Sequence, residues 1–163
     1  MDTLIIKKHS SVVQLPVTHV VNCSIRSNVF PEPWKKAIIT PIQKSGSPDL
    51  VSNYRPISIL PALSKILEKT VAKQLVDYLE NKHLLHPKQF GFRARYSTEL
   101  ANCYLTIKQL GLDEGNVVVA VFLDLKKAFE TVNHEILLNK LKTLHFSDQA
   151  NAWFRSYLKH REQ

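Results

Sequence analysis

The clearest regularity in this chain is a helical repeat of apolar residues near its middle. Between residues 62 and 82, apolar side chains recur every three or four positions, and the intervening positions carry mostly Lys, Glu and Asp. A repeat close to 3.6 residues places the apolar positions on one side of an α-helix. The sequence therefore predicts a surface helix over 62–82 that docks through one face.

Weaker helical patterns occur in four other stretches. Loosely spaced valines predict a helix from about Pro16 that ends before Phe30 and Pro31. Ser97 is a favourable N-cap for a helix reaching to about Leu112. Two more helices are predicted over residues 133–144 and 148–159.

Extended segments are predicted in three places. Residues 36–43 and 54–60 are short apolar stretches next to prolines, and a Ser-Gly-Ser-Pro-Asp sequence separates them. This arrangement indicates an edge hairpin with a flexible loop over residues 44–53. Residues 116–125 are nearly all apolar and rich in valine, which predicts a central strand covered on both faces. The mixture of helices and strands places the chain in the α+β class.

Composition narrows the class of protein. The length of 163 residues allows one compact domain or a piece of a larger one, and 44% apolar with 22% charged residues is typical of a folded chain. Cys23 and Cys103 lie far apart, so neither a zinc site nor a disulfide framework is indicated. No stretch reaches the roughly 18 apolar residues of a membrane span, and none resembles a signal peptide. We expect a location in the cytoplasm or nucleus, with no membrane partner.

The positive charge is unevenly placed. The net charge is +8, and residues 33–95 contain eleven Lys and Arg against four Asp and Glu. An excess of cations attracts polyanions, so a nucleic acid is the natural partner. A basic domain without such a partner is the alternative that charge alone leaves open.

Asp124 is the first candidate for chemistry, because a carboxylate at the end of a buried strand needs a cation or hydrogen-bond donors. Mg²⁺ is held by one or two carboxylates together with substrate phosphates. The alternative is that Asp124 caps a following helix. The neighbouring acids Asp113, Glu130 and Glu135 have no spacing that makes a second ligand, so the chain looks one carboxylate short of a two-metal site.

Two further groups of residues are candidates for binding. The loop around Gly91 combines cations, aromatic rings and a glycine, which suits contact with phosphates and bases; its members are Gln89, Phe90, Gly91, Phe92, Arg93 and Arg95. The alternative is a surface loop whose two phenylalanines lie in the core. Lys44 and Arg55 flank the hairpin loop, where they can meet a triphosphate or simply be solvated, and Phe129 by itself indicates a core aromatic.

Taken in order, these segments resemble the reverse transcriptase domain of LINE-type non-LTR retrotransposons, with a fainter similarity to group II intron reverse transcriptases. The resemblance extends from about Val17 to the end of the chain. The motifs that carry it are Phe30-Pro31 to Trp34-Lys35, Pro41-Ile42-Gln43-Lys44, Asn53-Tyr54-Arg55-Pro56-Ile57-Ser58, Ser64-Lys65 to Glu68-Lys69, Gln89-Phe90-Gly91-Phe92-Arg93, Ser97-Thr98, Phe122-Leu123-Asp124-Leu125-Lys126-Lys127-Ala128-Phe129, His134-Glu135 to Leu137-Leu138, and Trp153-Phe154 to Tyr157-Leu158.

The resemblance implies roles for individual residues. Asp124 matches the first catalytic aspartate, which coordinates Mg²⁺ with help from the Leu125 carbonyl. Phe129 matches the bulky residue that rejects a sugar 2′-hydroxyl. Lys44 and Arg55 match cations that hold the incoming deoxynucleoside triphosphate. The segment from Gln89 to Arg93, with Arg95, matches a region near the template, so the implied partners are an RNA template and a DNA primer.

The resemblance also implies a domain plan. Residues 1–29 form an N-terminal helical segment, and residues 30–163 supply the fingers and first part of the palm of a right-hand polymerase. The family's Pro-Gln-Gly and Tyr-x-Asp-Asp motifs are absent from the 163 residues, and Glu130 stands where the family usually has Asp. We therefore expect a partial RNA-directed DNA polymerase that is inactive alone. The rival expectations are a non-catalytic nucleic-acid-binding module and a retroelement relic without function.

Overall fold

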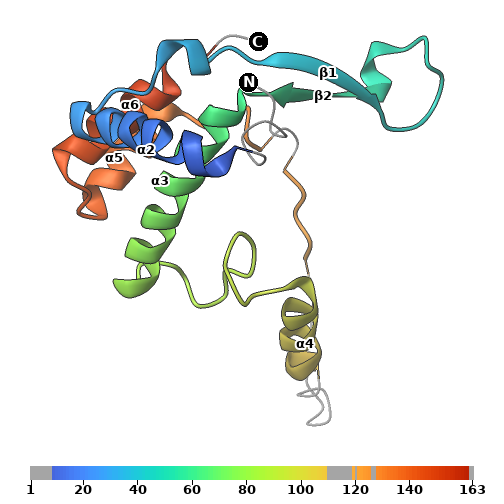
Figure 1. Ribbon diagram of the computed structural model, residues 1–163. Helices are drawn as coiled ribbons and strands as arrows, with labels where there is room; N and C mark the ends of the chain where they lie inside the picture. Colours follow the sequence, from blue (N-terminus) through green and yellow to red (C-terminus); the bar gives the residue numbers. More distant parts are fainter. Residues whose placement is uncertain (1–8, 110–118, 120, 126–127, 162–163) are drawn as a thin grey trace. The chain divides into compact units, whose positions relative to one another are not determined.

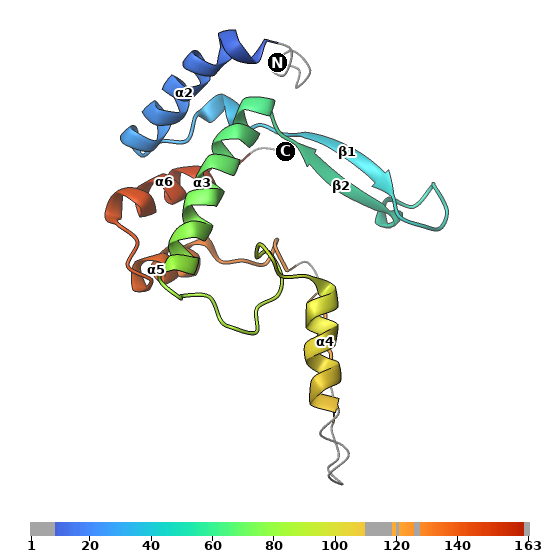
Figure 2. The same ribbon diagram turned by 60° about the horizontal axis from the view of Figure 1, so that its bottom comes forward.

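The computed structural model describes residues 9–109, 119, 121–125 and 128–161, and contains both helix and sheet (Figures 1 and 2). It divides into two compact units, residues 1–72 with 133–163 and residues 73–132, which are described separately below. The elements in chain order are α2 (Ser10–Ser27), η1 (Glu32–Trp34), β1 (Ile38–Gln43), η2 (Val51–Asn53), β2 (Tyr54–Ile59), α3 (Ala62–Asn81), α4 (Thr98–Gln109), α5 (His134–Thr143) and α6 (Asp148–Leu158).

Helix α2 begins six residues earlier than predicted and contains Pro16 in its interior. The carbonyl of His9 accepts hydrogen bonds from the N–H groups of Val12 and Val13, both at 3.1 Å, so the first turn forms upstream of the proline. Proline removes one backbone donor without preventing the turn on either side. The prediction was wrong because it treated Pro16 as the start of the helix. The helix ends at Ser27, and its C-cap residue Asn28 has a left-handed φ of 57°.

The first unit is built around four aromatic side chains, Phe30, Trp34, Trp153 and Tyr157, here called the core aromatic cluster. Phe30 is fully buried, and its ring lies edge-on to Trp34 at 6.3 Å, Trp153 at 5.7 Å and Tyr157 at 5.1 Å between centroids. Edge-to-face contacts at such distances add to the free energy gained by burial. The cluster joins the segment after α2 to helix α6.

Hydrogen bonds also hold α2 and the segment after it against helix α6. The indole Nε1 of Trp153 donates to Ser24 Oγ at 3.1 Å, and the backbone N–H of Phe30 donates to Ser156 Oγ at 2.9 Å. Ser24 Oγ in turn donates to the carbonyl of Val29 at 2.6 Å. Because buried polar groups are costly without partners, these bonds allow α2 and α6 to pack closely.

Helix α3 agrees with its predicted bounds to within one residue. Ser64 and Leu67 are fully buried in the first unit, while Lys65 and Lys69 are exposed, as expected for a helix docked by one face. Predicted helices α5 and α6 are confirmed as well. Asn133 Oδ1 accepts from the N–H groups of the first turn of α5, and Ser147 Oγ accepts from that of Ala150 in α6.

The predicted hairpin is confirmed. Strands β1 and β2 pair antiparallel, with Ile38 opposite Ile59 and Pro41 opposite Pro56. The pairing continues past the strands, since the N–H of Lys44 donates to the carbonyl of Asn53 at 2.8 Å. Gly46 has φ of 88° within the connecting loop, and a Cβ there would lie 2.7 Å from the side-chain nitrogen of Asn53. A glycine is required at this turn.

The central strand predicted over 116–125 is not found in the described part of that stretch. Residues 119 and 121–125 belong to no regular element, and the side chains of Val121, Phe122 and Leu123 are exposed. Residues 116–118 and 120 lie outside the described residues. A strand buried on both faces needs neighbouring strands to pair with its N–H and carbonyl groups. Within the described residues, the sheet consists of β1 and β2 alone, paired with each other.

Candidate functional site

Asp124 lies in the second unit, on an exposed segment rather than at the end of a buried strand. The next described helix, α5, is capped by Asn133, so the structure gives no support to Asp124 as its N-cap. Leu125 is 75% exposed. Both residues are therefore accessible to a ligand. Asp124 is exposed, whereas the sequence predicted a position at the end of a buried strand.

A cation site is incomplete in this part of the chain. The Asp124 carboxylate and the Leu125 carbonyl are oxygen donors of the kind that Mg²⁺ prefers. Among the described residues, however, no group of three or more His, Cys, Asp or Glu side chains converges. These two donors suit one edge of a Mg²⁺ site, and the other ligands would be water, phosphate oxygens or further carboxylates.

Phe129 is not a core aromatic. Its side chain is 81% exposed, and its ring lies edge-on to the ring of Phe92 at 6.2 Å between centroids. Phe92 is itself 88% exposed. We call these two residues the exposed aromatic pair. This contact joins the loop before α4 to the stretch after Asp124. The resemblance assigned the loop to the template and Phe129 to the sugar of the incoming nucleotide.

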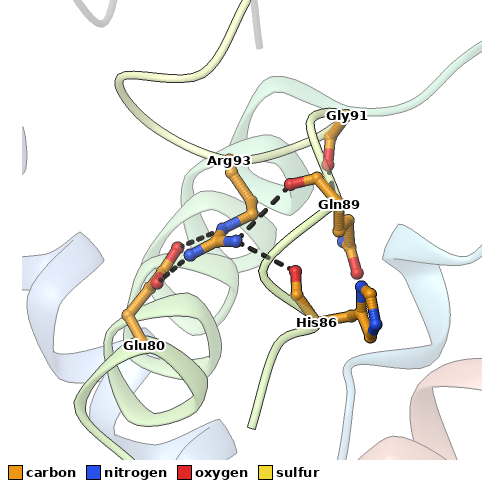
Figure 3. Close-up of polar contacts among 5 residues, drawn as sticks. All are labelled: Glu80, His86, Gln89, Gly91 and Arg93. Carbon is orange, nitrogen blue, oxygen red and sulfur yellow. Dashed lines mark hydrogen bonds and ion pairs between the residues drawn. The ribbon is translucent and has the colours of Figure 1, made fainter. Parts of the chain in front are cut away.

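The loop between α3 and α4 is organised by Arg93 (Figure 3). Its guanidinium donates to both carboxylate oxygens of Glu80, with Nε to Oε1 at 2.8 Å and Nη2 to Oε2 at 2.7 Å. Nη1 donates to the backbone carbonyls of His86 at 3.2 Å and Gln89 at 3.5 Å. Two parallel N–H···O bonds to one carboxylate form a strong and directional contact.

The electrostatics follow from this contact. Hydrogen bonding to Arg93 lowers the pKa of Glu80 below its usual value, against the opposing effect of burial, and the same bond raises the pKa of Arg93. The guanidinium also lies over the ring of Tyr96, 4.1 Å from its centroid. Arg93, predicted to contact template, is thus engaged within the chain.

The two phenylalanines of this loop take opposite positions. Phe90 is half-buried, with its ring 5.7 Å from that of Tyr96 and 6.0 Å from that of Tyr104. Phe92 points to solvent from a left-handed backbone with φ of 60°. The alternative that both rings lie in the core is therefore wrong for Phe92, and Phe90 is only partly buried, against two tyrosines outside the buried core.

The remaining residues of the loop are accessible. Gln89 and Arg95 are exposed, and Arg95 has φ of 66°. A Cβ built on Gly91 meets no atom within 4 Å, so packing inside the chain does not demand glycine there. Open space beside a backbone is compatible with the approach of a ligand.

Lys44 and Arg55 lie in the first unit, on the hairpin, and both are exposed. Arg55 is opposite Ile42 in the register, and Lys44 is two residues after Ile42. Because side chains alternate between the faces of a strand, Lys44 and Arg55 belong to the same face as diagonal neighbours. The register places these two cations on one face of the hairpin. In the second unit, Phe92 of the loop contacts Phe129.

Sequence reasoning missed Glu80 and Tyr96. Glu80 is thirteen residues from Arg93, too far for a local pattern to connect them, and it looked like any solvated acid on a helix. The nearest available signal was an acid close to the end of a helix followed by a basic loop. That signal is too common to identify a specific ion pair.

Comparison with known proteins decides the family. The family described as "Reverse transcriptase (RNA-dependent DNA polymerase)" matches residues 42–163, which is three quarters of the chain. The chain belongs to the reverse transcriptase family. The predicted site residues, from Lys44 to Phe129, all lie within the matched range.

Curated relatives within this family are retrotransposon proteins. The chain is 38% identical over 144 residues to the "Probable RNA-directed DNA polymerase from transposon BS" of Drosophila melanogaster, covering 87% of this chain and 16% of the relative. It is 33% identical over 144 residues to the "RNA-directed DNA polymerase from mobile element jockey" of the same species, with the same coverage. It is 35% identical over 133 residues to the "Retrovirus-related Pol polyprotein from type-1 retrotransposable element R2" of Popillia japonica, covering 80% and 18%.

The chain spans about one sixth of the length of these curated relatives. No solved structure matches it. Separately, none of the described helices combines the length and apolar character that crossing a bilayer requires.

Proposed function

We propose that this chain is part of an RNA-directed DNA polymerase that copies RNA into DNA during retrotransposition. The observation that carries the proposal is the family match over residues 42–163, a range that contains every predicted site residue. The non-LTR elements among the relatives favour an RNA template, a DNA primer and deoxynucleoside triphosphates as the ligands. In the proposed plan, residues 1–29 are an N-terminal helical segment and residues 30–163 are fingers and the first part of the palm.

The proposed nucleotide contacts are Lys44, Arg55 and Phe129. Lys44 and Arg55 share one face of the hairpin, so their two charges can meet neighbouring phosphates of a triphosphate. Phe129 is a large exposed ring, and a ring placed under the sugar would exclude a 2′-hydroxyl by its volume. The exposure of all three side chains supports binding roles rather than packing roles.

The proposed metal ligands are Asp124 and the carbonyl of Leu125. When bound, Mg²⁺ stabilises the charge on the attacking and leaving oxygens of phosphoryl transfer. The contribution of this chain is to hold one negative carboxylate where such an ion is needed. Because the 163 residues contain no Tyr-x-Asp-Asp sequence, we expect them to have no polymerase activity by themselves.

Primer extension tests the proposal. We would express these codons in frame with the downstream codons of the same gene, and supply a primed RNA template, Mg²⁺ and four deoxynucleotides. Asp124→Asn should reduce extension at least a thousandfold, since a charge that binds metal is lost. The matched control is Asp77→Asn, which changes an exposed aspartate on α3 and should retain full extension. Equal activity of the two variants would contradict the role of Asp124.

The basic stretch over residues 33–95 supports a second candidate, a nucleic-acid-binding module without catalysis. It predicts that the 163-residue chain binds single-stranded RNA and that log Kd changes steeply with log salt concentration. The two candidates separate in the primer-extension experiment, because the module predicts RNA binding with no extension by any form of the protein. Absence of binding at low salt would remove this second candidate.

A further inference from the structure

Arg93 occupies an unusual position for a residue expected to contact nucleic acid. Its side chain is 8% exposed, and its carboxylate partner Glu80 is 35% exposed. A guanidinium has five N–H donors, and the hydrogen bonds of Arg93 use all three of its nitrogens. With four of the five donors engaged in these bonds and the side chain 8% exposed, little of the guanidinium is accessible to a phosphate.

The contacts of Arg93 also link separate parts of the loop. They join the end of α3, through Glu80, to the carbonyls of His86 and Gln89 (Figure 3). The guanidinium also lies over the ring of Tyr96. Two residues close to Arg93 in the sequence adopt strained backbones, with φ of 60° at Phe92 and 66° at Arg95. Left-handed φ is unfavourable for residues with a Cβ and persists only where surrounding contacts enforce it.

The loop held in this way presents a different set of groups. Phe92 is 88% exposed beside Phe129, the guanidinium of Arg95 is exposed, and the space at Gly91 is open. An exposed ring with a nearby cation is the combination that binds single-stranded nucleic acid, through base stacking and phosphate contact. The charge of Arg93 is largely offset by Glu80, whereas the exposed guanidinium of Arg95 is accessible to phosphate.

We propose that Arg93 is a positioning residue: clamped by Glu80, it fixes the loop so that Phe92 and Arg95 face single-stranded nucleic acid, and it does not itself bind phosphate. This inference rests on the proposed role of the loop near the template. It assigns Glu80 to the binding machinery, although a carboxylate would ordinarily weaken RNA binding.

The decisive comparison uses two variants that change net charge in opposite directions. Glu80→Gln adds one positive charge and Arg93→Gln removes one. If Arg93 bound phosphate directly, Glu80→Gln would free it and tighten binding, while Arg93→Gln would weaken it. If the two residues form a clamp, both variants should weaken binding of a single-stranded RNA oligonucleotide by about threefold to tenfold, because a charge-assisted bond of this kind contributes about that factor or more.

Coupling to Arg95 distinguishes positioning from a general loss of stability. In the unmodified chain, Arg95→Gln should weaken RNA binding and reduce the slope of log Kd against log salt by about one. In the Glu80→Gln background, Arg95→Gln should weaken RNA binding and reduce the salt slope by less than half as much, since the loop no longer presents the guanidinium. A change in folding stability alone would leave the two effects independent. Arg93→Lys should not restore binding, because an ammonium lacks the planar fork.

Backbone hydrogen exchange without RNA gives a second measurement on the same variants. The N–H of Gln89 donates to the carbonyl of His86 at 2.9 Å, and that of Tyr96 donates to the carbonyl of Arg93 at 3.4 Å. Both amides should exchange about tenfold faster in Glu80→Gln and Arg93→Gln, with no change at Leu67 in the core. Tighter RNA binding by Glu80→Gln, or unchanged exchange at both amides, would overturn the proposal. If the unmodified chain bound no RNA, the template role would fail, and the exchange data would still decide whether Arg93 positions the loop.

Discussion

The core aromatic cluster and the exposed aromatic pair contain the same kind of side chain in opposite surroundings. In the first unit, Phe30 is fully buried against three other rings, and polar bonds fix the backbone beside it. In the second unit, Phe92 and Phe129 meet edge to face while each stays more than 80% exposed. Burial of this size stabilises a fold, whereas an exposed pair of rings gains little from its own contact.

The difference explains which aromatics belong to folding and which are available for binding. Exposing a large apolar ring lowers solubility, so two exposed rings in contact are a sign of a binding surface. Phe92 also has a left-handed backbone, with φ of 60°, although its ring is 88% exposed and gains little from burial. Three changes test how far this contrast holds, and a fourth tests the ion pair that holds the loop carrying Phe92.

The largest expected effect is from Phe30→Ala. Removing a fully buried ring leaves a cavity among Trp34, Trp153 and Tyr157, and should lower the free energy of unfolding by about 3–5 kcal/mol. Urea unfolding followed by tryptophan fluorescence measures it, since both indoles report on the cluster. Phe92→Ala is the matched control and should stay within about 0.5 kcal/mol of the unmodified chain. Similar losses for the two variants would remove the contrast.

Phe92→Ala should instead affect binding. Loss of a stacking ring typically weakens single-stranded nucleic-acid binding by about 1–3 kcal/mol, and fluorescence anisotropy with a labelled RNA measures the change. Phe92→Leu keeps apolar surface but removes the ring, so it should be nearly as weak as alanine. Full binding by the leucine variant would show that the aromatic face is not what the RNA contacts.

A smaller effect is expected for Trp153→Phe. This change keeps a ring in the core aromatic cluster but removes the Nε1 donor that bonds Ser24 Oγ at 3.1 Å. The free energy of unfolding should fall by about 1 kcal/mol from the lost hydrogen bond, with some further loss of packing. Thermal unfolding monitored by circular dichroism is suitable here because the substitution removes one fluorophore. Ser24→Ala provides the control, and the double variant should lose less than the sum of the two single losses.

The smallest effect concerns pH. Arg93 lowers the pKa of Glu80 below its usual value of 4.5, so the ion pair stabilises the loop fully above that pH and loses its effect as pH falls through the lowered pKa. Carboxyl resonances measured by NMR should show Glu80 titrating below pH 4.5, and nearer to 4.5 in Arg93→Gln. Glu135, whose pKa is lowered by a hydrogen bond from Arg155, is an internal control that should not respond to that variant. An unchanged Glu80 titration in Arg93→Gln would contradict the ion pair.

Local patterns were sufficient for much of the fold. The bounds of α3, α5 and α6 follow from apolar periodicity and from capping by Asn133 and Ser147, all of which are encoded within a few residues. The hairpin follows from two apolar stretches and a turn sequence. Pro16 misled the prediction for α2, because the penalty of one missing donor was smaller than the gain from extending the helix.

Non-local contacts were not predictable from one sequence. The apolar run before Asp124 has strong strand propensity, yet propensity produces a strand only where another strand supplies hydrogen bonds. The ion pair of Glu80 with Arg93 and the meeting of Phe92 with Phe129 depend on how the chain returns on itself. The sequence singles out Arg93 and Arg95 alike as candidates, and only the structure shows that Arg93 is paired with Glu80 while Arg95 is exposed.

The paired prolines of the hairpin have a consequence for how the protein behaves at high concentration. In an antiparallel pair of strands, hydrogen-bonded residue pairs alternate with pairs whose N–H and carbonyl groups face outward. The hydrogen bond from Lys44 to Asn53 makes residues 44 and 53 a hydrogen-bonded pair. The opposed Pro41 and Pro56 are therefore a pair whose nitrogens face outward. Each outer edge of this isoleucine-rich ribbon therefore lacks an amide donor at its middle. A further strand could not pair along either edge without a gap, so the ribbon resists the edge-to-edge stacking that leads to fibrils.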